Sequence, residues 1–87
     1  MKHAGAAALD RLEPLLARIR THAALKEKSR GCFYLKRRGL VHFHEDPAGM
    51  FADLSTPDGQ DDRLKVDDAD GADELLRRIA DILGPGA

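Results

Sequence analysis

Residues able to bind a metal ion gather around one short stretch of the 87-residue chain. His42 and His44 are separated by a single residue, and the only cysteine, Cys32, precedes them. Two side chains at positions i and i+2 of a β-strand point to the same side. Imidazole, thiolate and carboxylate are the ligands that Zn²⁺ takes in proteins. The sequence therefore predicts a candidate divalent-metal site made of His42, His44, Asp53 and Cys32.

The same stretch offers a small-molecule site as an alternative. An imidazole beside a carboxylate can act as a general base, and a phenol or thiol can serve as its partner. The residues of this alternative are His42, His44, Asp53, Cys32 and Tyr34. No serine or cysteine stands in a nucleophile elbow, and Gly49 and Gly59 are isolated turn residues outside any phosphate-binding loop. We therefore assign no catalytic residue and expect a protein that is not an enzyme.

Strand alternation explains half of this cluster. Residues 32–36 and 40–45 alternate between apolar and polar side chains, which is typical of two half-buried strands. We expect Arg37–Gly39 to form a three-residue hairpin loop with a positive φ at Gly39. Such a loop pairs the apolar residues of one face as Leu35 with Val41 and Phe33 with Phe43.

A third strand, over residues 50–54, is expected to pair with the second after a turn at residues 47–49. The expected register places Met50 opposite Glu45, and it continues with Phe43–Ala52 and Val41–Leu54. A slip by one residue would bury Asp53 without a partner, which is unfavourable. Residues 63–66 alternate once more and predict a short fourth strand.

Two amphipathic helices flank these strands. Apolar residues at three- and four-residue steps predict a firm helix from Pro14 to about Leu25, with a frayed turn before it and a break at Gly31. A second helix is expected to begin at a cap on Asp70 and to end at residues 84–86. Together the elements predict one domain over residues 1–87. Its class is α+β, a two-layer sandwich of order α-β-β-β-(β)-α, with an antiparallel meander sheet and both helices on one face.

No element remains to cover the other face of this sheet, and that face gives the main functional expectation. Aromatic side chains are enriched in the cores of interfaces, and exposed apolar residues often mark binding sites. The candidate interface residues are Tyr34, Leu40, His42, His44 and Phe51. We expect a small binding domain that uses this face for homodimerisation or for a protein partner.

Charge is unevenly distributed along the chain, which raises nucleic acid as a further partner. Residues 1–44 carry 10 Lys and Arg against 3 Asp and Glu, whereas residues 45–87 carry 4 against 12. Weak RNA binding would use Lys36, Arg37, Arg38, Arg63 and Lys65. Because the net charge is only −1, the sequence does not favour nucleic acid as the partner.

The remaining composition bears on the setting of the protein. A chain with 43% hydrophobic and 33% charged residues is typical of a small globular domain. A single cysteine excludes an intrachain disulfide and indicates a reduced, cytoplasmic setting. No stretch approaches the roughly 18 apolar residues that a membrane helix needs, so we expect no membrane partner.

Overall fold

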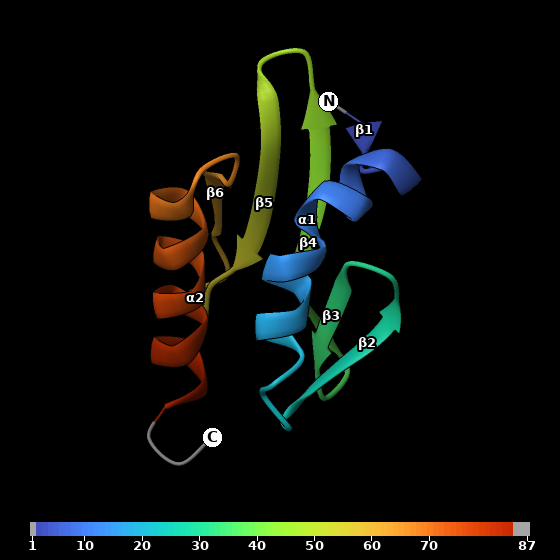
Figure 1. The fold of residues 1–87 in the computed structure, drawn as a ribbon. Coiled ribbons are helices and arrows are strands. Elements are labelled where there is room, and N and C mark those ends of the chain that lie inside the picture. The colour runs from blue at the N-terminus through green and yellow to red at the C-terminus, as the bar shows by residue number, and fades with distance from the viewer. Residues whose placement is uncertain (1, 85–87) are drawn as a thin grey trace.

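Two helices and six strands make up the computed structural model, which describes residues 2–84 (Figure 1). The helices are α1 (Ala6–Ile19) and α2 (Ala69–Leu83). The strands are β1 (Lys2–His3), β2 (Leu25–Ser29), β3 (Cys32–Leu35), β4 (Arg38–Asp46), β5 (Gly49–Ser55) and β6 (Asp61–Lys65). The α+β class is confirmed, and the sheet has two strands more than the sequence predicts.

The strands form one antiparallel sheet in the order β2-β3-β4-β5-β6. The short strand β1 pairs with β4 as well, through Lys2 opposite Glu45 and His3 opposite His44. Because β5 occupies the other edge of β4 along these residues, β1 and β3 lie one after the other along the same edge. Strand β1 therefore pairs with the part of this edge of β4 that lies beyond β3.

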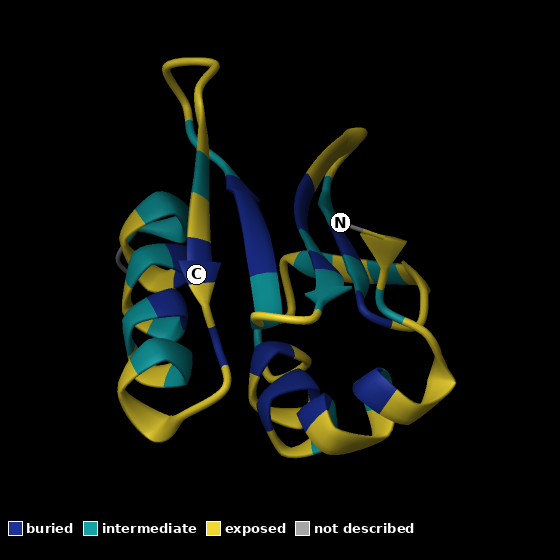
Figure 2. Cartoon of the chain, turned by 90° about the horizontal axis from the view of Figure 1, so that it is seen from above, coloured by how far each residue is buried: buried dark blue, intermediate teal, exposed yellow. Residues whose placement is uncertain are grey.

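Both helices pack on one face of this sheet and close a single core, as predicted. The apolar residues of α1 recur at three- and four-residue steps, so they form one buried stripe. Figure 2 shows the buried residues of strands and helices lying toward one another, with exposed connecting turns. The largest fully buried side chains are Phe33, Leu16, Ile19, Leu54, Leu75, Ile79 and Val41.

The predicted span of the first helix is wrong at both ends. Helix α1 begins at Ala6, runs through Pro14, and ends at Ile19 instead of continuing to Leu25. Proline lacks the N–H that would bond to the carbonyl of Asp10, and its ring crowds that carbonyl, but its fixed φ of about −65° is a helical value, and the helix continues through Pro14. Beyond the helix, Glu27 of β2 accepts hydrogen bonds from Arg20 at 2.6 and 3.0 Å, which holds the charged edge strand β2 against the end of α1.

The loop of the β3–β4 hairpin also differs from the prediction in its residues and its length. The observed loop is Lys36–Arg37, and Lys36, not Gly39, carries the positive φ, of 57°. The observed pairs are Phe33 with Val41 and Leu35 with Arg38, in place of Leu35–Val41 and Phe33–Phe43.

This hairpin contains a β-bulge that changes the position of one predicted interface residue. The register shifts between Phe33–Val41 and Tyr34–Gly39, so Leu40 is an extra residue on β4. The bulge turns Leu40 into the core, where it is only 5% exposed, and it lines a cavity together with Leu35 and Ile82. The expectation that Leu40 lies on the open face is therefore wrong.

The β4–β5 register agrees with the prediction at every pair. Val41 lies opposite Leu54, Phe43 opposite Ala52, and Glu45 opposite Met50. Gly49 makes the turn possible, because its φ of 140° is a conformation that side chains rarely permit. The same register places His42 opposite Asp53 and His44 opposite Phe51 on the uncovered face.

Helix α2 begins at a different cap from the predicted Asp70. Asp68 is the N-cap, and its carboxylate accepts a 2.8 Å hydrogen bond from the backbone N–H of Gly71. Gly84 ends the helix, while residues 85 and 86 of the predicted stop lie outside the described residues.

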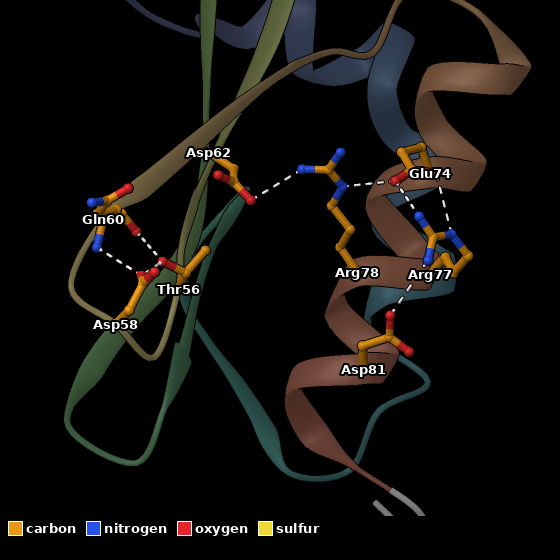
Figure 3. Close-up of polar contacts among 8 residues, drawn as sticks. All are labelled: Thr56, Asp58, Gln60, Asp62, Glu74, Arg77, Arg78 and Asp81. Carbon is orange, nitrogen blue, oxygen red and sulfur yellow. Dashed lines mark hydrogen bonds and ion pairs between the residues drawn. The ribbon is translucent and has the colours of Figure 1, made fainter.

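One ion pair, between Arg78 and Asp62, joins α2 to β6 (Figure 3). Arg78 donates to Glu74 on its own helix at 2.7 Å and to Asp62 on β6 at 3.0 Å.

None of the helices within residues 2–84 is both long and apolar enough to cross a membrane.

Candidate functional site

The uncovered face of β4 carries the two histidines of the predicted site. His42 and His44 alternate with Val41 and Phe43, whose side chains are buried in the core, so both imidazoles project from the opposite face. Each is half-buried. Alternation along one central strand is therefore what positions them.

A third histidine, which the sequence did not predict as a ligand, completes a cluster. His3 lies on β1 directly opposite His44. A hydrogen bond from the N–H of Ala4 to the carbonyl of Phe43, at 3.1 Å, and an ion pair between Lys2 and Glu45, at 3.2 Å, hold β1 against β4. Because β1 is so short, nothing in the hydrophobic pattern indicated that His3 belongs to the sheet.

The three imidazoles are close enough to share one metal ion. One ligand nitrogen from each of His3, His42 and His44 lies within 4.8 Å of the other two. The ring centroids of His3 and His44 are 4.7 Å apart, and those of His42 and His44 are 4.8 Å apart. Tetrahedral Zn²⁺ with Zn–N bonds of about 2.0–2.1 Å needs nitrogens roughly 3.3 Å apart, so small side-chain rotations would form the site.

Two nitrogens of this cluster lack hydrogen-bond partners. Nδ1 of His42 and Nδ1 of His44 are both buried, and within residues 2–84 neither makes a hydrogen bond. Nδ1 of His44 lies 3.0 Å from Oδ2 of Asp53, close enough for an ion pair but not aligned as a hydrogen bond. A buried polar atom without a partner is unfavourable, and a metal ion coordinated at Nδ1 of His42 would satisfy that atom.

Asp53 lies on β5 opposite His42, and its carboxylate lies against the ring of His44. Its carboxylate accepts hydrogen bonds from Arg63 at 2.7 and 3.1 Å and is only 8% exposed. The Arg63 hydrogen bond holds the pKa of Asp53 below its usual value of 3.8 despite burial. The carboxylate is therefore ionised and directed at His44, an arrangement that orients a metal-binding imidazole.

Burial affects the protonation of the central imidazole. Desolvation lowers the pKa of His44 below 6.5, and the neighbouring His42, His3 and Arg63 act in the same direction, while Asp53 opposes them. A neutral imidazole is the form that binds metals. The lowered pKa therefore favours the neutral form of His44 at neutral pH.

Cys32 and Tyr34 lie beside this cluster. Both line a cavity of about 200 Å³ together with His3 and His42. The predicted pairing of Leu35 with Val41 would have set Tyr34 opposite His42, which is wrong. Tyr34 pairs with Gly39, and its ring lies 4.3 Å from the ammonium of Lys28. The same predicted pairing would have set Cys32 opposite His44, which is also wrong, because His3 lies opposite His44.

The predicted site residues are thus placed as follows. His42 and His44 come together as expected, His3 joins them, Asp53 contacts His44, and Cys32 lies near His42. Phe51 stands opposite His44 and is half-buried.

Comparison of the chain with protein-family models, with curated proteins and with solved structures gave no match.

Proposed function

We propose that this protein is a small metal-binding domain that holds one divalent transition-metal ion on the uncovered face of its sheet. The ligands are His3, His42 and His44. The observation that carries the proposal is the convergence of three ligand nitrogens within 4.8 Å of one another, from two paired strands. Imidazole ligands favour Zn²⁺ and its neighbours in the transition series over Mg²⁺ and Ca²⁺, which prefer oxygen.

Two further features support binding in preference to a chance grouping of histidines. The strands place His3 and His44 directly opposite one another, so both backbones fix the separation of the rings. Asp53, itself held by Arg63, lies against the ring nitrogen of His44 that a metal ion would leave free. Carboxylates in this position fix the orientation of the ligand and raise its basicity.

Titration calorimetry with Zn²⁺ on protein that carries no affinity tag tests the proposal. We expect one ion per chain. Replacing His3 by glutamine should weaken binding by more than the roughly 10- to 100-fold that loss of a supporting hydrogen bond costs. His3 is exposed, so His3→Gln leaves the core intact.

His22 supplies the matched control, because it is the fourth histidine and lies outside the cluster, in the connection between α1 and β2. His22→Gln should leave Zn²⁺ binding unchanged. Absence of binding by the wild type, or equal losses in His3→Gln and His22→Gln, would refute the proposal.

A second candidate use of the same face is a homodimer interface. The half-exposed ring of Phe51 beside the histidines, on a face that no helix covers, favours it. Light scattering should then show a dimer for the wild type and a monomer for Phe51→Lys. A monomeric wild type would exclude this candidate and leave the metal site untouched.

A further inference from the structure

We propose that Cys32 supplies the fourth ligand of this site, so that the ion is held by three imidazoles and one thiolate. The inference rests on the proposed function, since it presupposes an ion at His3, His42 and His44. It makes the site closed, with four protein ligands. Closed tetrahedral sites bind an ion firmly without an open position for substrate.

The strand order places Cys32 next to the histidines of β4. His3 on β1 lies opposite His44, and Phe33 on β3 lies opposite Val41. Cys32 is the next residue of β3, so continuing the antiparallel register sets it beside His42. Directly opposed residues on one face have Cβ atoms roughly 4.5–5.5 Å apart. The four candidate ligands thus form two adjacent cross-strand pairs.

A cavity lies beside the pair of Cys32 and His42. The cavity of about 200 Å³ is bounded by His3, His42 and Cys32, with Gly39 and Tyr34 at its border. Because Gly39 has no side chain, nothing from that position fills the space. A cysteine side chain rotates about its Cα–Cβ bond between staggered positions, so its sulfur can turn into the cavity toward the imidazoles of His3 and His42.

Charge supplies an independent reason for a thiolate. Three imidazoles are neutral ligands and leave the charge of a divalent ion uncompensated. The carboxylate in contact with the cluster is Asp53, which is already paired with Arg63 at 2.7 Å. An anionic fourth ligand is therefore favoured, and the thiolate of Cys32 is the anion that the cavity can supply.

The binding step is balanced without any other reactant. The S–H bond of Cys32 breaks, a bond from sulfur to the metal forms, and the proton passes to the buffer. No atom is oxidised or reduced. Binding to the wild type should thus release about one proton more than binding to Cys32→Ser at a pH where the imidazoles are neutral.

Cobalt spectroscopy tests the inference, with Co²⁺ in place of Zn²⁺ and a phosphine reductant instead of a thiol. The wild type should show the near-ultraviolet charge-transfer band of a cobalt–thiolate bond. Cys32→Ser should bind Co²⁺ with the same stoichiometry but more weakly, and it should lack that band. Calorimetry in buffers of different ionisation enthalpy should show the difference of one proton.

The result that overturns the inference differs from the one that overturns the proposed function. If the wild type binds one ion through its histidines but shows no thiolate band and no extra proton release, Cys32 is not a ligand and the three-histidine site stands. If the wild type binds no ion, both proposals fall together.

Discussion

The imidazole of His44 is the centre of the three-histidine cluster, because it lies against His3, His42 and Asp53. Its ring lies 4.7 Å from that of His3 and 4.8 Å from that of His42, and its Nδ1 lies 3.0 Å from Asp53. With Nδ1 directed at a carboxylate, Nε2 is the nitrogen left for a metal ion. The roles of the neighbouring residues can therefore be tested one at a time.

Asp53→Asn tests the supporting carboxylate. The amide is nearly the same size but carries no charge, so it cannot raise the basicity of His44. We expect Zn²⁺ affinity to fall about 10- to 100-fold while one ion still binds per chain. Asp62→Asn is the control, since it also removes a carboxylate paired with an arginine, Arg78, but lies away from the histidines. Equal effects of the two variants would contradict the assigned role of Asp53.

Acid should weaken metal binding at this site. Protons compete with the metal for each imidazole, and the pKa of His44 lies below 6.5 because of burial. Affinity should therefore fall as the pH drops through 6.5 and below. Calorimetric titration with Zn²⁺ across this range measures it. An affinity that rises toward lower pH would be inconsistent with imidazole ligands.

At the scale of elements, the β4–β5 turn sets which residues face one another across the site. Gly49 has a φ of 140°, and a Cβ atom there would lie 2.2 Å from Oδ2 of Asp67, whose carboxylate accepts from the N–H of Met50 at 3.0 and 3.1 Å. The turn therefore requires glycine for both its backbone conformation and its space.

Gly49→Ala should consequently destabilise the fold by about 1–3 kcal/mol, the usual range for a residue forced into a sparsely populated conformation. Chemical denaturation measures the change. Gly39→Ala is the matched control, because a Cβ there would meet Tyr34 at an ordinary 3.8 Å without a positive φ. If the two alanine variants were equally stable, the turn would not have the importance given to it here.

The sequence predicted those elements whose alternation is long enough to be diagnostic. The register of β4 and β5 followed from Val41, Phe43 and Asp53, because a slip would have buried the aspartate alone. The edge strand β2 was missed, since its segment LKEKS contains a single apolar residue and four polar ones. The bulge at Leu40 was missed because positive φ was assigned to Gly39 and not to Lys36.

Strand length also decided which histidines of the candidate site could be predicted. His42 and His44 were predicted, and His3 was not. His42 and His44 lie on a long central strand with a clear period of two, so their common face could be inferred. His3 lies on a strand of two residues, too short for any period. Its place depends on tertiary pairing with β4, which the local sequence does not encode.

At the scale of the whole molecule, a metal ion would stabilise a small domain. Ligands that bind only the folded state stabilise it by about 2.7 kcal/mol at a free concentration of 100 times Kd. For a domain of this size each kcal/mol raises Tm by about 4–8 °C. Zn²⁺ at that concentration should thus raise Tm by about 11–22 °C in the wild type and in His22→Gln. A Tm unaffected by Zn²⁺ would contradict binding to the native state.

The ion would also join the N-terminal strand to the centre of the sheet. Within residues 2–84, β1 is held by the pairing of Lys2 and His3 with β4, the hydrogen bond of Ala4, and the ion pair between Lys2 and Glu45. A shared ion adds a link between β1 and β4 that depends on no further burial of apolar surface. Under this proposal, metal binding would therefore strengthen the attachment of β1 to β4.

The most direct test of the central claim is nuclear magnetic resonance of the imidazole nitrogens during titration with Zn²⁺. We predict that His3, His42 and His44 shift together and saturate at one ion per chain, while His22 does not change. If His22 shifted alongside them, or if no imidazole responded, the claim that the uncovered face of the sheet holds a metal ion would be wrong.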